Sequence, residues 1–257
     1  MRRKTLLPTK KEKLFVLSRI CRSGIGRLIS PVLLRFGYVL KRVNQTGLWA
    51  PAYLRRLGFN PRTVVDVGVG SGTYSLYETF PKCNHILIEP LEEFEADLQK
   101  ILLKYKGRYF LTTLGAHEGK HIMNIESIML QRSSFLERTS LEKTGDPLLK
   151  REVPLTTLDA LDERYHFEPP FGLKIDSEGY ECQIVKGASK FLQKTLFVIA
   201  EISVADRFLN GYSFAEYIEL MHRNQFRLCD ILDIGRHGPL LELTFVDMVF
   251  RRASKIK

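Results

Sequence analysis

The sequence predicts an α/β protein in which helices cover both faces of a mostly parallel sheet, preceded by a basic N-terminal helical arm. Two observations predict the sheet: short apolar, β-branched runs alternate with segments of helical periodicity from Thr63 onward, and a glycine-rich turn directly follows the first run. The length of 257 residues suits one such domain with an appendage. Contents of 44% hydrophobic and 26% charged residues exclude a wholly disordered chain, a collagen and a disulfide scaffold.

The predicted strands are apolar runs, most of them bounded by Gly, Pro or Asp. In chain order they are Thr63–Val67, His85–Ile88, Tyr109–Leu114, Gly172–Ile175, Leu196–Ile202, Phe226–Ile231 and Phe245–Phe250. Helical periodicity predicts the helices that lie between several of them, at Thr73–Thr79, Leu91–Tyr105, Cys182–Leu192 and Ser213–Asn224. Because parallel strands need crossover connections, this alternation indicates a mostly parallel sheet. Residues 118–170 exceed one crossover, and we interpret them as an insertion near a substrate site.

The N-terminal quarter of the chain is strongly basic. Residues 1–62 contain fifteen Lys and Arg but one acid, Glu12, whereas the remainder holds 24 basic and 28 acidic residues, so the arm supplies the whole net charge of +10. Apolar residues recur at near-helical intervals from Leu14 to Leu40, and two glycines and Pro31 interrupt them, which predicts two short amphipathic helices. We place this extension at residues 1–60 and the main domain at residues 61–257.

Three roles remain open for the arm. Its apolar stripe could pack on the body, or the amphipathic helices of residues 1–42 could lie on an anionic membrane surface. The arm could also contact nucleic acid or act as an organellar targeting segment. Nucleic acid is the less favoured partner, because the body of the protein is slightly acidic and shows no basic, aromatic-rich groove.

The spacing of the cysteines and the length of the apolar runs indicate the cellular compartment. The four cysteines lie far apart without a CxxC pair, which argues against a zinc knuckle or a disulfide framework and suits a reducing compartment. No apolar run reaches about 18 residues, so no transmembrane helix is predicted. Arg19 and Arg22 interrupt any apolar core of a signal peptide. We expect a cytoplasmic protein, with peripheral attachment to the inner face of the membrane as the alternative that the arm leaves open.

The sharpest local signal is a glycine loop after the first strand. Gly68, Gly70 and Gly72 follow the strand and precede a helix, and Glu89 ends the second strand 21 residues beyond Gly68, the place of a carboxylate that binds a ribose. A dinucleotide fingerprint is GxGxxG, whereas this loop is GxGxG with Asp66 beside it. An acid there would repel a pyrophosphate but suits a positively charged ligand. The loop therefore favours S-adenosylmethionine over NAD. The alternative is a glycine-rich turn that binds no ligand.

A second signature lies in the segments KIDSEGYE (174–181), VKGA (185–188) and VPLTTLDAL (153–161). In this order and spacing they resemble the FkbM-type S-adenosylmethionine-dependent methyltransferases, over roughly Pro61 to the C-terminus. The resemblance implies a class I, Rossmann-like sheet of seven strands whose last strand, at Phe245–Phe250, is antiparallel. It also implies methyl transfer, usually to a hydroxyl of a sugar, glycoconjugate or other natural product.

The resemblance also implies roles for individual residues. Asp66, Gly68, Gly70 and Gly72 would contact the methionine part of the cofactor, and Glu89 would hold the ribose. Ala116 and His117, within the segment Gly115-Ala116-His117 at the end of the third strand, would lie near the adenine. The basic arm lies outside the resemblance.

Three acids are candidates for chemistry at the methyl acceptor. Asp176 and Glu178 follow the fourth strand and Glu201 ends the fifth, so all three could meet at the carboxyl edge of a parallel sheet. One could remove the proton of an acceptor hydroxyl, or two could hold a divalent cation, which we do not favour; alternatively, Asp176 and Glu178 only cap the next helix. His117 is a second candidate base.

Two rival functions use the same fold. In an RNA methyltransferase the basic arm would contact phosphates, and binding would weaken steeply with salt. In a non-catalytic binding module the fold would persist without activity, and the arm would be the docking element. The complete glycine loop and the intact acids favour the enzyme.

Overall fold

The computed structural model describes residues 49–141, 145, 147–237 and 242–253. Residues 1–48 of the basic extension lie outside the described residues, and with them the expected amphipathic helices and their membrane, nucleic-acid and targeting roles. Within the described ranges, no helix has both the length and the apolar character needed to cross a bilayer.

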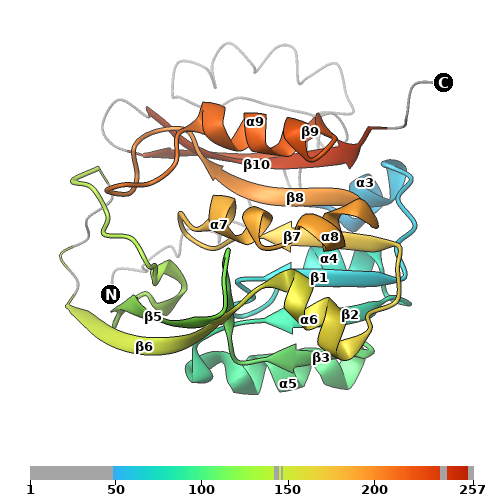
Figure 1. The fold of residues 1–257 in the computed structure, drawn as a ribbon, viewed down its shortest axis with the longest axis horizontal. Coiled ribbons are helices and arrows are strands. Elements are labelled where there is room, and N and C mark those ends of the chain that lie inside the picture. Colours follow the sequence, from blue (N-terminus) through green and yellow to red (C-terminus); the bar gives the residue numbers. More distant parts are fainter. Residues whose placement is uncertain (1–48, 142–144, 146, 238–241, 254–257) are drawn as a thin grey trace, which may run out of the picture. The chain divides into compact units, whose positions relative to one another are not determined.

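A seven-stranded sheet forms the centre of the described chain (Figure 1). Its strands are β1 (Thr63–Val67), β2 (Asn84–Ile88), β3 (Gly107–Phe110), β7 (Phe171–Ile175), β8 (Thr195–Ser203), β9 (Phe226–His237) and β10 (Glu242–Arg252). They lie in the order β3-β2-β1-β7-β8-β10-β9. Strand β10 is antiparallel to both of its neighbours, whereas β3, β2, β1, β7 and β8 pair in parallel. The expected mostly parallel sheet with an antiparallel last strand is confirmed.

Helices cover both faces of this sheet. They are α3 (Pro51–Arg56), α4 (Tyr74–Thr79), α5 (Glu95–Lys104) after the short helix η1 (Glu92–Phe94), α6 (Leu158–Tyr165), α7 (Glu181–Lys186), α8 (Ser189–Gln193) and α9 (Phe214–Arg223). Val65 and Val67 of β1 pack in one core with α6 to α9, and Val64, the residue before Val65, packs in the other with α3 to α5. Alternate strand residues thus face opposite helix layers, as burial on both faces requires.

The expected strand at Tyr109–Leu114 is two strands in different sheets. Strand β3 belongs to the main sheet, whereas β4 (Thr113–Leu114) pairs with β6 (Leu148–Thr156) in a second sheet of order β4-β6-β5. Its third member, β5 (Gly119–Glu126), pairs antiparallel with β6, so the segment expected as an insertion supplies most of a small sheet beside the main one (Figure 1). The apolar run continues across the break, which is why the sequence alone suggested one strand.

The expected helix at Cys182–Leu192 is interrupted between α7 and α8. A Cβ atom added to Gly187 would lie 1.9 Å from the carbonyl oxygen of Gly115, so only glycine permits this close approach of the two backbones. The other expected helices match α4, α5 and α9 closely. Helix α9 begins at a capping box in which Ser213 and Glu216 exchange side-chain to backbone hydrogen bonds.

Residues immediately before the predicted domain boundary at residue 60 pack against the sheet. The indole nitrogen of Trp49 donates to Asp247 at 2.5 Å, and the hydroxyl of Tyr53 donates to Asp230. Leu54 of α3 is buried in the core that this helix forms with α4 and α5. The division at residue 60 stays a prediction.

Candidate functional site

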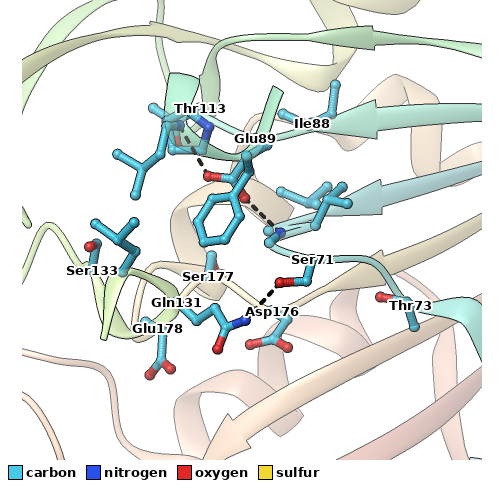
Figure 2. Close-up of a pocket in the computed structure, with 18 of the residues that line it drawn as sticks. Ser71, Thr73, Ile88, Glu89, Thr113, Gln131, Ser133, Asp176, Ser177 and Glu178 are labelled. Carbon is cyan, nitrogen blue, oxygen red and sulfur yellow. Dashed lines mark hydrogen bonds between the residues drawn. The ribbon is translucent and has the colours of Figure 1, made fainter. Parts of the chain in front are cut away.

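A cavity of about 330 Å³ opens at the carboxyl ends of the parallel strands. The loop after β1 forms one wall, the ends of β2, β7 and β8 contribute acids, and the segment from β5 to Phe135 forms the opposite wall. Figure 2 shows the carboxylates of Asp176 and Glu178 on the side of the drawn site opposite to Glu89. Ligands of open α/β sheets bind at this edge, and the volume lies in the range of small-molecule sites.

The glycine loop is fixed by close backbone contacts. Gly68 has a φ of 72°, and a Cβ atom on it would lie 1.7 Å from the carbonyl oxygen of Asp176. The amide of Asp176 donates to the carbonyl of Val67 at 3.0 Å. The end of β1 and the turn after β7 are therefore held together, and the turn carries an acid to the cavity.

Glu89 faces the glycine loop from the end of β2. Its carboxylate accepts hydrogen bonds from the amides of Gly70 at 2.9 Å and Leu91 at 3.1 Å. Burial raises the pKa of Glu89 above its usual value, and the two amide donors oppose the shift. Each carboxylate oxygen has a further lone pair, so the group can still accept from the hydroxyls of a ligand.

Asp66 lies beneath the loop rather than in the cavity. It is fully buried and is not among the residues that line the cavity. Its carboxylate accepts from the hydroxyl of Tyr77 at 2.5 Å and lies 3.3 Å from the ammonium of Lys174. The structure thus differs from the expected direct contact of Asp66 with a cofactor, because on β1 this side chain points into the sheet and helix core.

Lys174 connects Asp66 to the cavity. Its ammonium lies 3.3 Å from Asp176 and donates to the carbonyl of Gly68 at 3.1 Å. Burial lowers the pKa of Lys174, but the carboxylates of Asp66 and Asp176 outweigh burial and hold the pKa above its usual value. The lysine is therefore charged, and its charge balances two acids.

Asp176, Glu178 and Glu201 meet at one end of the cavity. Their carboxylate oxygens can all lie within 4.8 Å of one another. Arg207 donates to Glu178 at 3.0 Å and to Glu201 at 2.7 Å, and Arg138 lies 3.1 Å from Glu178. Burial and the charges of Asp176 and Glu178 raise the pKa of Glu201 well above its usual range, although Arg207 opposes the shift.

The backbone of Glu178 is held in an uncommon conformation. Its φ is 49°, in the left-handed region that non-glycine residues rarely occupy, and its carbonyl accepts from Ser134 at 2.6 Å. Such strain persists where surrounding contacts fix it and is frequent at functional sites. The contact with Ser134 ties the acid turn after β7 to the insertion.

The family assignment follows from the sequence of this same region. Residues 66–228, more than half of the chain, match the family described as the methyltransferase FkbM domain. The chain belongs to the FkbM methyltransferase family. Nothing among curated proteins matches the sequence significantly.

Solved structures with a similar fold are distant in sequence from this FkbM domain. A 1,6-didemethyltoxoflavin-N1-methyltransferase from Burkholderia thailandensis, solved with that compound and S-adenosylhomocysteine, is 13% identical over 98% of this chain and 93% of its own, with a TM-score of 0.39. Magnesium protoporphyrin IX methyltransferase from Synechocystis, solved with S-adenosylmethionine, is 11% identical over 96% of this chain and 86% of its own, with a TM-score of 0.38.

The FkbM domain brings most of the predicted site residues together. Seven of them line the cavity: Gly68, Gly70, Gly72, Glu89, Asp176, Glu178 and Glu201. Ala116 and His117 are not among the lining residues, and His117 is exposed. The chain leaves the main sheet after β3, so Thr112 and Thr113 reach the cavity instead.

Sequence reasoning missed three cations of the FkbM domain. Lys174 carried a signal, since it is a charged residue within the otherwise apolar strand β7. Arg138 and Arg207 carried none, because arginines in polar loops are ordinarily exposed, yet these two are 6% and 4% exposed. Both arginines are buried because they pair with Glu178 and pack against Phe208.

Proposed function

We propose that this FkbM domain binds S-adenosylmethionine in the cavity and methylates a hydroxyl of a sugar, a glycoconjugate or another natural product. The observation that carries the proposal is the placement of Glu89 and of the acid cluster on opposite sides of one cavity bounded by the glycine loop. Glu89 suits the two ribose hydroxyls of a nucleoside, and the acid cluster suits the place where the methyl group is transferred.

The lining of the cavity fits such a cofactor in its polarity. Leu91, Phe94, Met123 and Phe135 provide an apolar wall suited to an adenine ring. Glu89 would hold the ribose hydroxyls, and the acids would face the positively charged sulfonium and ammonium groups. When bound, S-adenosylmethionine would supply an electrophilic methyl group.

Glu201 is our choice of proton acceptor. A hydroxyl becomes a competent nucleophile as its proton leaves, and a carboxylate is a better base when its pKa approaches the working pH. Burial raises the pKa of both acids, but more strongly that of Glu201, which pairs with Arg207 alone, whereas Glu178 pairs with both Arg207 and Arg138. As the acceptor oxygen forms its bond to the methyl carbon and the sulfur–carbon bond breaks, the hydroxyl proton would pass to Glu201.

Calorimetric titration tests the cofactor assignment. Wild-type protein should bind S-adenosylmethionine and S-adenosylhomocysteine at micromolar levels and give no response to NAD. Glu89→Ala should weaken binding by roughly tenfold or more, since a hydrogen bond to a charged group contributes about 1.5–3 kcal/mol. The matched control is Glu152→Ala, which removes an exposed carboxylate of β6 that does not line the cavity. No binding by a folded wild-type protein would overturn the proposal.

The N-terminal arm enters this proposal through its sequence. We infer that residues 1–42 attach the enzyme to an anionic membrane, where an acceptor linked to lipid would be presented. Co-sedimentation with anionic but not with neutral vesicles, lost on deletion of residues 1–42, is the expected result. Equal sedimentation of the truncated protein would contradict a membrane role for the arm.

A further inference from the structure

The acid cluster has the spacing of a divalent-cation site. Asp176, Glu178 and Glu201 each offer an oxygen within 4.8 Å of the others, and they are the only such group of three in the described part of the chain. Hard oxygen ligands at this spacing are what Mg²⁺ or Mn²⁺ requires. The arginines around the cluster decide whether a metal can enter.

Arg207 already spans two of the three acids. One terminal nitrogen of its guanidinium lies 2.7 Å from Glu201, and the other lies 3.0 Å from Glu178. A guanidinium is always positively charged, and when it donates to two carboxylates at once, its orientation is fixed as well. It therefore stands where a cation would otherwise bridge Glu178 and Glu201.

The surroundings of Arg207 hold it in that position. Its side chain is 4% exposed, and its guanidinium carbon lies 5.3 Å from the ring centre of Phe208 and 4.8 Å from that of Phe245. Aromatic faces attract a guanidinium and exclude water from it. Removing this side chain would leave two partly buried carboxylates without the cation that they share.

The other acids of the cluster also have cations from the chain. Arg138 lies 3.1 Å from Glu178 and, through its Nε, 2.8 Å from Glu126. Lys174 lies 3.3 Å from Asp176. Because each acid of the cluster is paired with a cation of the chain, a divalent ion that bridged Glu178 and Glu201 would have to displace a buried guanidinium.

We propose that Arg207 is the resident cation of the acid cluster, in place of a divalent metal, and that it positions Glu201 toward the methyl acceptor. The positioning role rests on the proposed function, whereas the occupation of the cation position does not. Arg207 contacts neither cofactor nor acceptor in this proposal, so it is a positioning residue.

Mn²⁺ titration followed by electron paramagnetic resonance tests the proposal on the full chain. Wild-type protein should show no saturable Mn²⁺ binding at the cluster. Arg207→Met, which keeps the apolar stem of the side chain but removes its charge, should bind Mn²⁺ at least about tenfold more tightly than the wild type, because Glu178 and Glu201 lose the counter-ion that they share. Arg207→Lys should not gain this binding.

Arg151→Met is the matched control. Arg151 forms a similar two-nitrogen contact with Glu93, at 2.6 and 2.9 Å, but on the exposed surface of the insertion. Its replacement should create no Mn²⁺ site. Absence of any gain in a folded Arg207→Met protein would overturn the proposal, because a merely structural arginine predicts no gain of metal binding.

The wild-type titration decides the matter even if Arg207→Met does not fold. Saturable Mn²⁺ binding by the wild type that is lost in Glu201→Gln would show a metal where the proposal places a guanidinium. The S-adenosylhomocysteine titration is read separately, so failure to bind that ligand would overturn the proposed function and leave the Mn²⁺ result to judge the role of Arg207.

Discussion

Lys174 pairs with two acids: Asp66, which is buried beneath the glycine loop, and Asp176, which lines the cavity. Lys174→Met would leave Asp66, which is fully buried, without its cation. We expect a loss of about 3–5 kcal/mol in the free energy of unfolding, the usual result of removing one partner from a buried pair. Urea unfolding measures it. The double variant Lys174→Met with Asp66→Asn should recover part of the loss. Equal stability of the single variant Lys174→Met and this double variant would contradict the energetic coupling between Lys174 and Asp66.

Asp247 links stability to pH. Burial raises its pKa from 3.8 to about 6, while the indole of Trp49 opposes the shift. The folded protein therefore binds a proton here more tightly than the unfolded chain, so this group favours folding most below about pH 4, and its contribution is lost as the pH rises to about 6. A shift of this size corresponds to at most about 3 kcal/mol.

Asp247→Asn removes that titration and keeps an oxygen that can accept from Trp49. At pH 7 the variant should be more stable than the wild type, and the difference should shrink as the pH falls toward 4. Thermal unfolding across that range provides the measurement. A variant less stable than the wild type at pH 7 would show that the negative charge is favourable there.

At the residue scale, the local pattern revealed the glycines and the acids that line the cavity, but not the cations that pair with these acids. Glu89 and Asp176 could be found because each follows an apolar strand: Glu89 stands 21 residues beyond Gly68, and Asp176 begins a turn that contains Gly179. Asp66 stands before the same glycine loop, yet its side chain points to the core, which depends on the twist and pairing of β1. Arg207 acquires its role from contacts between β8, the loop after it and the turn after β7.

At the scale of elements, the short helix η2 (Leu130–Arg132) and the glycine loop meet across the cavity. The amide of Gln131 donates to the hydroxyl of Ser71 at 3.0 Å, the contact drawn in Figure 2. We expect Gln131→Ala to speed dissociation of S-adenosylhomocysteine by about two- to tenfold, the range of a single hydrogen bond. Stopped-flow competition measures the rate.

Gln99→Ala is the control for that measurement. Gln99 is a glutamine of α5 with an exposed side-chain hydrogen bond to Tyr109, and it does not line the cavity. Its replacement should leave the dissociation rate unchanged. Equal rates for Gln131→Ala and the wild type would mean that the contact with Ser71 does not retain the ligand.

The elements that sequence reasoning located well are those with local signals. Strands β1, β2 and β7 are short apolar runs with turn residues at their ends, and α9 begins with a capping box. The split between β3 and β4 has no such signal. It exists because Thr113 and Leu114 pair with Leu155 and Thr156, a partner that only the folded chain supplies.

At the scale of the whole molecule, the cavity is lined by residues of both the main sheet and the small sheet β4-β6-β5. A ligand that contacts both should reduce amide hydrogen exchange in residues 68–72 and also in residues 130–135, whereas α9, which supplies no lining residue, should be unaffected. Exchange measured by mass spectrometry with and without S-adenosylhomocysteine makes the comparison. Protection confined to the main sheet would contradict a site shared by the two sheets.

The pairing of β1 has a consequence for the protein as it is being synthesised. Thr63 pairs with Asn84 on one side and with Phe171 on the other, and the turn after β7 closes onto Val67 and Gly68. The glycine loop thus leaves the ribosome long before the strand that completes its surroundings. A nascent chain that ends before β7 has no finished cavity, so cofactor cannot rescue a truncated product, and ligand-assisted folding begins only once the second half of the chain has emerged.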